Sequence, residues 1–484
     1  MLTATLYILV EMKMHSVKEN KMDATVVTQE AQTQNGMRSL KGSTNACVDL
    51  FYKIGASRGR DITAEFTQAL LENSDVALRI AQWARDVRGG AGERQLFRDI
   101  LVNLEQRDPE MALSLMRKVP EIGRWDDLFV FTTPRLKAEA YAMLKAAILE
   151  GNGLAAKWCP RKGPVAHELR IHFGMTPKQY RKTLVGLTKV VETQMCANDW
   201  DNINFSHVPS QASRIYRKAF NRHTTLFAEY VDKLANKDTS VKVNASAIFP
   251  HDVIKGVAHG YMDKTELGHI QAQWDALPNY VGMASILPLV DVSGSMTCSA
   301  GKTGVRCIDV AVGLGLYLAD KNQGAFKEKF LTFSTEPQLL ELKGSVVEKL
   351  YQMVKSDWQM STNLHRAIDC VLENALLNNV PEADMPKMLL VLSDMQFDQC
   401  VRYDDSAMEM IERRYAQAGY AVPHIVFWNL NSHNNVPVTA HKSGAALVSG
   451  FSPSIMSALL SADVSQFTPE GIMLNTLMVP RYDI

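Results

Sequence analysis

The stretch that decides the fold is Leu287-Pro288-Leu289-Val290-Asp291-Val292-Ser293-Gly294-Ser295-Met296. Its first half is an apolar run, which is typical of a strand buried on both faces of a sheet. Its second half places a carboxylate, two hydroxyls and a glycine directly after that strand. In open α/β sheets, ligands bind just beyond the carboxyl ends of the strands. The sequence therefore predicts a loop that offers oxygen ligands from Asp291, Ser293 and Ser295.

Oxygen ligands of this kind suit a hard divalent cation, because Mg²⁺ binds oxygen in near-octahedral geometry and usually keeps several waters. Two downstream loops can add ligands. Thr362 precedes a helix predicted over residues 364–377, and Asp394 ends a second apolar strand predicted over residues 388–394. We therefore expect Mg²⁺, or another divalent cation, to bind these two residues together with the first loop. The alternative is that the two aspartates only cap the helices that follow them.

This order of ligand loops, with helices between them, resembles the metal-ion-dependent adhesion site of von Willebrand factor A domains. The matching residues are Asp291, Ser293, Ser295, Thr362 and Asp394. The resemblance implies an open coordination position that an acidic residue of a protein partner can fill. From Ile286 to Leu460 strands alternate with helices, and this alternation favours a mostly parallel, doubly wound sheet.

The composition and charge of the chain are typical of a soluble globular protein. The 484 residues contain 52 Lys and Arg and 52 Asp and Glu, so the whole chain has no electrostatic preference for nucleic acid or membrane. Seven scattered cysteines without a C-x-x-C pair argue against a disulfide framework or a zinc site and favour a reducing cytoplasm. The apolar segment Leu2 to Val10 is too short to cross a membrane. We expect a cytoplasmic protein without a membrane partner.

The first half of the chain is predicted to be helical. From Ala46 to about Trp274, apolar residues recur at spacings of three and four, which is the pattern of amphipathic helices. We expect an all-α helical-repeat domain, a HEAT-like solenoid or ring, followed by the α/β domain. The predicted boundaries are a disordered lead-in at 1–40, the helical domain at 41–277, the α/β domain at 278–461, and a tail at 462–484 that folds back on either domain.

One segment of the helical half is strongly basic. Between Lys157 and Arg222 there are twelve Lys and Arg residues against four Asp and Glu, which gives this segment a net charge of +8. Aromatic residues are interleaved with them. Basic side chains bind phosphates, and aromatic or guanidinium faces stack on unpaired bases. The alternative is a solvated basic face whose aromatic residues belong to the core.

The two halves together resemble the Ro autoantigen family, in which a TROVE region of helical repeats precedes a von Willebrand factor A domain. They are also similar to less characterised relatives of that family, domains of unknown function in plants and some viruses. The matching motifs are Arg85-Asp86-Val87-Arg88-Gly89-Gly90, Gly123-Arg124-Trp125-Asp126-Asp127-Leu128, Lys157-Trp158-Cys159-Pro160-Arg161-Lys162, Phe249-Pro250-His251-Asp252, Asp291 to Met296, Ser393-Asp394-Met395-Gln396-Phe397-Asp398 and Val426-Phe427-Trp428-Asn429-Leu430.

The resemblance to Ro proteins implies binding of small noncoding RNAs and of the single-stranded ends of misfolded RNAs. The residues expected to bind RNA are Lys157, Arg161, Lys162, Arg170, Lys178, Arg181, Lys182, Arg214, Arg217 and Lys218. The first three lie in a matching motif, whereas the others rest on charge and helical context.

The leading hypothesis is a non-enzymatic RNA-binding protein whose Mg²⁺-dependent site holds a protein partner. Binding of RNA would weaken steeply with salt. A second hypothesis is a protein-interaction scaffold without RNA binding. A third is a metal-dependent phosphoryl-transfer enzyme with Asp291 as the nucleophile, which would need a positioned acid or base beside it.

Overall fold

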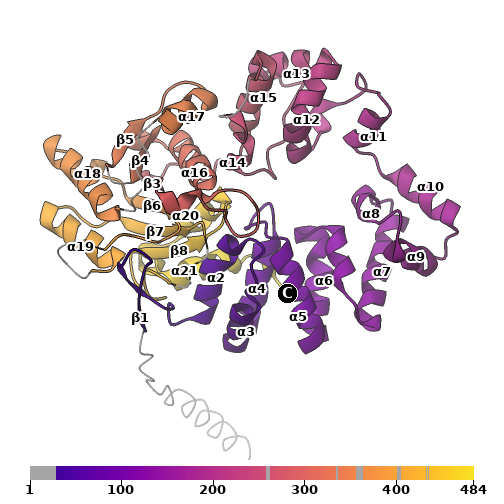
Figure 1. Ribbon diagram of the computed structural model, residues 1–484, viewed down its shortest axis with the longest axis horizontal. Helices are drawn as coiled ribbons and strands as arrows, with labels where there is room; N and C mark the ends of the chain where they lie inside the picture. The colour runs from indigo at the N-terminus through magenta and orange to yellow at the C-terminus, as the bar shows by residue number, and fades with distance from the viewer. Residues whose placement is uncertain are drawn as a thin grey trace, which may run out of the picture.

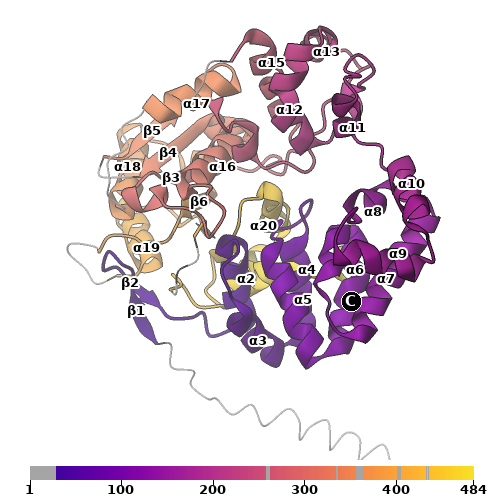
Figure 2. The ribbon, with the colours of Figure 1, turned by 45° about the vertical axis from the view of Figure 1, so that its right-hand side comes forward.

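The computed structural model describes residues 29–257, 262–333, 336–355, 363–399, 405–431, 433 and 435–484. Its ribbon forms a ring in which an arc of helices begins and ends on one α/β domain (Figures 1 and 2). No helix within these residues is long and apolar enough to cross a membrane.

The arc starts with a run of helices that pack side by side. Side-chain caps fix where they begin: the Asn73 side chain accepts from the Val76 N–H, and Asp108 caps a helix whose first residue is Pro109. These helices are α2 (Ala46–Ser57), α3 (Thr63–Glu72), α4 (Ser74–Arg85), α5 (Gln95–Arg107) and α6 (Pro109–Ile122). The short helix η1 (Trp125–Val130) then leads to α7 (Pro134–Leu149), α8 (Gly153–Trp158), α9 (Pro164–Phe173) and α10 (Pro177–Leu187).

The next part of the arc has a small core of its own. Phe205 lies at its centre, with its ring centroid 5.2 Å from that of Phe220 and 5.1 Å from that of Phe227. This cluster is separate from the main core that runs through the rest of the chain. The helices here are α11 (Val191–Cys196), α12 (Ser210–His223) and α13 (Leu226–Ala235), followed by α14 (Pro250–Val253) and α15 (Lys264–Asp275).

The α/β domain contains a six-stranded sheet in the order β5-β4-β3-β6-β7-β8, parallel except at the β5 edge. The strands are β3 (Ile286–Asp291), β4 (Lys329–Phe333), β5 (Gln338–Glu341), β6 (Met388–Ser393), β7 (His424–Asn429) and β8 (Ala445–Ser449). The helices are α16 (Cys307–Lys321), α17 (Val346–Lys355), α18 (Leu364–Leu377), α19 (Ala407–Ala418), α20 (Met456–Ser461) and α21 (Pro469–Leu477). In Figure 1, α18 and α19 lie on the opposite side of the sheet from α16. The predicted alternation of strands and helices is confirmed.

The arc closes on the α/β domain at both of its ends. At one end α2 packs on β7 and β8, and at the other α14 packs on α16 and α15 on α17. The Gly55 N–H donates to the Ser449 hydroxyl at 3.0 Å, and that hydroxyl donates to the Phe51 carbonyl at 3.0 Å. A Cβ at Gly55 would lie 2.7 Å from the Ser449 carbonyl oxygen, so this approach requires glycine.

The C-terminal segment contacts both domains, as the prediction allowed. Helix α21 packs on β8 and on α4. Beyond it, Arg481 forms an ion pair with the buried Asp86, and the Tyr482 hydroxyl donates to the same carboxylate at 3.2 Å. Gln82 donates to the Tyr482 carbonyl at 2.9 Å. We call these four residues the C-terminal clasp.

The predicted disordered lead-in does not extend to residue 40. Strands β1 (Glu30–Gln32) and β2 (Arg38–Leu40) form an antiparallel hairpin. The Thr33 hydroxyl donates to the Phe397 carbonyl at 2.6 Å, and Leu40 and Val436 exchange backbone hydrogen bonds of 2.9 and 2.8 Å. The hairpin gains order from these partners in the α/β domain, which a local reading of a polar segment does not reveal. Residues 1–28 lie outside the described residues.

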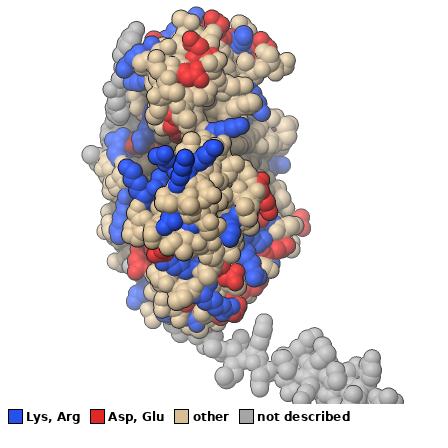
Figure 3. Space-filling view, turned by 90° about the vertical axis from the view of Figure 1, so that its right-hand side faces the viewer, with Lys and Arg blue, Asp and Glu red and all other residues tan. Residues whose placement is uncertain are grey.

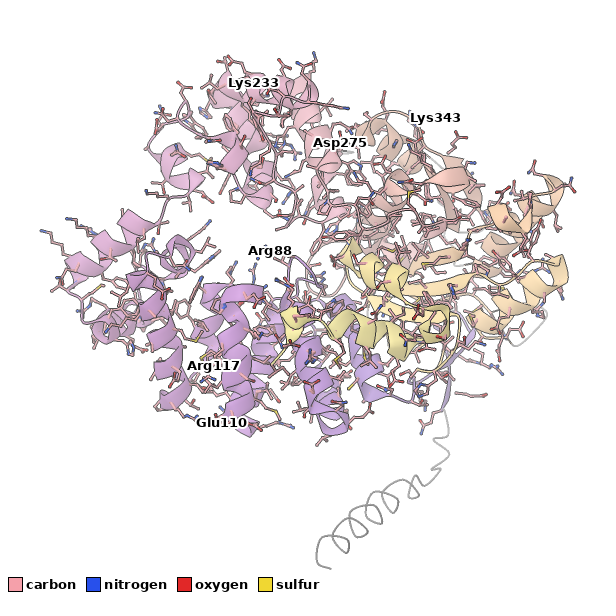
Figure 4. All side chains as sticks on the ribbon, turned by 180° about the vertical axis from the view of Figure 1, so that it is seen from behind. Arg88, Glu110, Arg117, Lys233, Asp275 and Lys343 are labelled. Atoms are coloured by element: carbon pink, nitrogen blue, oxygen red, sulfur yellow. The ribbon has the colours of Figure 1, made fainter. Side chains whose placement is uncertain are left out.

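We expect Arg481→Ala to lower the free energy of unfolding by about 1–3 kcal/mol, because it leaves the buried Asp86 carboxylate without its cation. Urea unfolding followed by circular dichroism measures this change. Arg117→Ala is the matched control, since Arg117 is exposed on the outer part of α6 (Figure 4). Equal losses in the two variants would contradict a specific role for the clasp.

Candidate metal centre and nucleic-acid interface

Two buried carboxylates meet at the carboxyl ends of neighbouring strands. Asp291 ends β3 and Asp394 directly follows β6, and these strands pair in parallel. Asp291 is 0 % exposed and Asp394 is 1 % exposed. The Ser393 hydroxyl donates to Asp291 Oδ2 at 2.5 Å, which ties the two strand ends together. The structure thus brings together the two aspartates that the sequence singled out.

The two predicted hydroxyl residues lie beside this pair. The Ser293 N–H donates to Asp291 Oδ1 at 2.9 Å, and this bond folds the loop back toward the strand end. The Oγ atoms of Ser293 and Ser295 are 3.0 Å apart. Thr362, the fifth predicted ligand, lies outside the described residues.

A second row of polar groups, which the sequence reasoning missed, surrounds Asp394. His433 Nε2 lies 3.8 Å from Asp394 Oδ2, and Asn431 Nδ2 lies 3.5 Å from the same histidine nitrogen. Arg60, from the turn after α2, donates to Asn431 Oδ1 at 2.8 Å. The polar residues after β7 could have indicated this row, because they also follow the end of a strand of this sheet.

Burial and like charge set the electrostatics of the pair. Burial raises the pKa of the Asp291 carboxyl to about 7, with the negative charge of Asp394 as the second cause, while hydrogen bonds from Ser293 and Ser393 oppose the rise. Burial also raises the pKa of Tyr52, and the charge of Asp394 adds to it. Two adjacent buried carboxylates are costly unless protons or a cation neutralise them.

The donor set fits a hard divalent cation. It offers carboxylate and hydroxyl oxygens, and the 3.0 Å between the Ser293 and Ser295 oxygens equals the separation of about 3 Å expected for adjacent ligands around Mg²⁺. Within the described ranges no group of three or more His, Cys, Asp or Glu side chains is arranged to hold a metal ion. The candidate set therefore depends on its hydroxyls, and Asp291, Ser293, Ser295 and Asp394 are the described residues that would hold the ion.

Of the ten predicted RNA-binding residues, five are exposed, and their side chains make no hydrogen bond or ion pair within the described part of the chain. Three of them share one face of α10, because they are spaced by three and four residues. The five residues are Lys162, Lys178, Arg181, Lys182 and Lys218. Figure 3, which views the side of the molecule that carries α9 to α11, shows Lys and Arg residues gathered across the middle of this face. We call Lys178, Arg181 and Lys182 the α10 basic face.

Three predicted arginines have structural partners instead. Arg161 donates to the carbonyls of Ala156 and Cys159 at 2.8 and 2.7 Å, and Arg170 donates to the Met175 carbonyl at 3.1 Å. Arg217 is only 6 % exposed. Its prediction as an RNA contact is wrong, because helical spacing turns this side chain inward beside the Met262 sulfur.

The other two predicted residues are partly engaged. Arg214 donates to Gln211 Oε1 at 3.1 Å. Lys157 Nζ lies 3.9 Å from Glu192 Oε1 and 5.7 Å from the Trp158 ring centroid, so it is held near an aromatic face.

A cavity of about 1000 Å³ separates α8 and α10 from α11 and α12. Exposed Leu154, Val185 and Ile215 line it together with Trp158 and Lys189. The cavity thus combines apolar and aromatic surface with positive charge.

Arg124 lines the same cavity and was not among the predicted RNA-binding residues. Its guanidinium lies 3.7 Å from the centroid of the Trp158 ring and pairs with Asp126. In the sequence, Arg124 stands out only as part of the matching motif from Gly123 to Leu128. The stack on Trp158 becomes visible only when η1 and α8 are placed side by side.

In the presence of a chelator, we expect the free energy of unfolding to fall as the pH rises from about 4 to about 7. The folded-state pKa of Asp291 is raised, so the folded protein binds its proton more tightly than the unfolded chain does across this range. This contribution is present below the unfolded pKa and is lost as the pH rises through about 7. Denaturant titrations at several pH values measure it, with an expected loss of about 2–4 kcal/mol from this group.

Asp291→Asn should flatten that part of the profile, because the amide does not titrate. A wild-type profile that matches the Asp291→Asn profile between pH 4 and 7 would refute this assignment of the proton.

Comparisons with known proteins divide the chain where the fold does. A model described as "Domain of unknown function (DUF2828)" matches residues 33–124 and 163–281, and a model described as "Domain of unknown function (DUF7788)" matches residues 285–475. The two matches meet just before β3, where the helical arc gives way to the sheet.

The chain is also similar to the uncharacterized protein L728 of Acanthamoeba polyphaga mimivirus. The two are 29% identical over 510 residues, which cover 92% of this chain and 86% of the viral protein. Among solved structures, the Deinococcus radiodurans RO (RSR) protein matches with a TM-score of 0.36 and 13% identity, over 87% of this chain and 92% of that chain. Similarity to the viral protein thus extends over both the helical arc and the α/β domain.

Proposed function

We propose that this protein binds RNA, small noncoding or with single-stranded ends, on the α10 basic face and in the adjoining cavity. The observation that carries the proposal is three cationic side chains on one face of α10 with no partner in the described chain. Unpaired cations on a rigid helix suit phosphates, because each neutralised phosphate releases counterions.

The cavity would bind the bases of the RNA, whereas the α10 basic face would bind its phosphates. The Arg124 guanidinium and the Lys157 ammonium lie 3.7 and 5.7 Å from the centroid of the Trp158 ring, so an aromatic face and positive charges lie together. Aromatic and guanidinium faces stack on bases without selecting a sequence. The motifs that resemble Ro proteins support the same ligand class.

We further propose that the two-aspartate centre binds Mg²⁺ in the manner of a von Willebrand factor A domain and holds an acidic residue of a protein partner. When bound, the ion would supply positive charge and an open coordination position. Asp291 and Asp394 would provide the compensating charge, and the hydroxyls of Ser293 and Ser295 would complete the described ligands. The proposal is one of binding, without a catalytic step.

The α10 basic face provides the test for RNA. We expect Lys178→Glu/Arg181→Glu/Lys182→Glu to weaken binding of a fluorescent single-stranded RNA by about 10- to 100-fold and to reduce the slope of log affinity against log salt by about 0.7 for each phosphate that the variant no longer neutralises. Fluorescence anisotropy across a salt series measures both. Arg161 is left unchanged, because its guanidinium holds backbone carbonyls.

The matched control reverses three basic residues on α5 and α6, Arg107→Glu/Arg117→Glu/Lys118→Glu, and should keep wild-type affinity. If both triple variants weaken RNA binding equally, the effect depends only on the net charge of the protein. Affinity that does not change with salt, or no affinity for any RNA, would favour the scaffold without RNA binding.

We expect Mg²⁺ to raise the melting temperature, because an ion that binds only the folded state adds about 2.7 kcal/mol when its concentration is 100 times its dissociation constant. Differential scanning calorimetry with Mg²⁺ and with chelator measures the shift. Ser293→Ala/Ser295→Ala should abolish it. Asp384→Asn, which changes an exposed carboxylate before β6, should retain it. If Mg²⁺ still raises the melting temperature of the double serine variant, the ion binds at another site.

A further inference from the structure

Cys298 and Cys307 lie opposite each other across a hairpin next to the candidate metal centre. Ser299 and Arg306 form an antiparallel bridge at the base of this hairpin. The Cys307 N–H donates to the Cys298 carbonyl at 3.0 Å, and the Ala300 N–H donates to the Val305 carbonyl at 2.8 Å. The two cysteines therefore occupy directly paired backbone positions.

Paired positions of this kind suit a disulfide. Directly opposed residues of antiparallel pairs have Cα atoms about 4.5–5.5 Å apart, and disulfides join Cα atoms separated by about 4.4–6.8 Å. The thiols of Cys298 and Cys307 are also close enough to interact electrostatically. All six described cysteines are free thiols.

The two thiols differ in access. Cys298 is exposed, whereas Cys307 is buried as the first residue of α16, with its sulfur 3.8 Å from the Leu430 carbonyl oxygen. An exposed thiol with a second thiol behind it is the arrangement of a peroxide-reactive cysteine and its resolving partner.

We propose that Cys298 and Cys307 form a reversible disulfide when the protein meets a peroxide. The Cys298 sulfur attacks one peroxide oxygen, the O–O bond breaks, and Cys298 becomes a sulfenic acid while the leaving hydroxide takes up a proton to form water. The Cys307 sulfur then displaces the hydroxyl from Cys298, the S–S bond forms, and the second water leaves with the Cys307 proton. The two sulfurs together lose two electrons, and hydrogen peroxide is reduced to two waters.

The disulfide between Cys298 and Cys307 would form at a place where the helical arc contacts the α/β domain. The Lys302 N–H donates to the Arg58 carbonyl at 2.8 Å, and a Cβ at Gly301 would clash with that oxygen, so the hairpin tip sits directly on the end of α2. The Cys298 sulfur also accepts from Asn431 Nδ2 at 3.4 Å, so the bridge would form beside the polar groups that surround Asp394. Oxidation would thus tie the loop after Ser295 to the first turn of α16.

The test uses the full-length reduced protein and equimolar hydrogen peroxide. Free thiols are then alkylated in denaturant, and the protein is digested with trypsin without reductant. Trypsin cuts after Lys302 and Arg306, so the two cysteines fall in separate peptides that only a disulfide joins. We expect the joined species in the mass spectrum and its loss after dithiothreitol treatment.

Variants identify the roles of the two thiols. Cys307→Ser should give no joined species and leave a sulfenic acid at Cys298 that dimedone traps, whereas the matched control Cys370→Ser should keep the disulfide. Separate alkylation of Cys298 and Cys307 in the peroxide-treated wild-type protein would overturn the proposal. A bridge from Cys298 to any other cysteine would also overturn it. The wild-type experiment decides this even if Cys307→Ser fails to fold.

Discussion

The structure depends on one helix that serves both domains. Ten of the twelve residues of α2 are buried, and a helix that is buried all round belongs to the interior of a protein. One side of α2 continues the helical arc, and another packs on β7 and β8 at the glycine contact between Gly55 and Ser449. Because of this helix, the arc and the sheet share one hydrophobic core.

The sharing of α2 also shapes the chemistry at the edge of the sheet. Tyr52 lies on α2 close enough to Asp394 for the two to interact electrostatically, and Arg60 follows α2 and reaches Asn431. The carboxylate pair is therefore buried by the helical arc as well as by the sheet. Residues from the first sixty positions and from beyond position 290 thus set the charge balance of one centre.

The sequence predicted features that depend on local pattern. Asp291 and Asp394 come at the ends of apolar strands. Because the carboxyl ends of parallel strands lie at one edge of a sheet, the two carboxylates were expected there together. Contacts between segments far apart in the chain were not predictable in this way. The hairpin of residues 30–40 is ordered by Phe397 and Val436, and no local pattern points to these partners.

Charge alone did not show which basic residues are exposed. The spacing of Lys178, Arg181 and Lys182 places them on one exposed face, but a count of basic residues cannot separate these from Arg217, whose side chain is buried. Only the packing of α12 against its neighbours makes that distinction. Similarly, the stack of Arg124 on Trp158 depends on the tertiary placement of two short elements.

The C-terminal clasp has a consequence for the order of events during synthesis. Asp86 is translated early, whereas Arg481 and Tyr482 emerge 395 and 396 residues later. Until then, the Asp86 carboxylate lacks the cation that pairs with it and the hydroxyl that donates to it. The contacts that complete the surroundings of α4 therefore come from residues made late in synthesis.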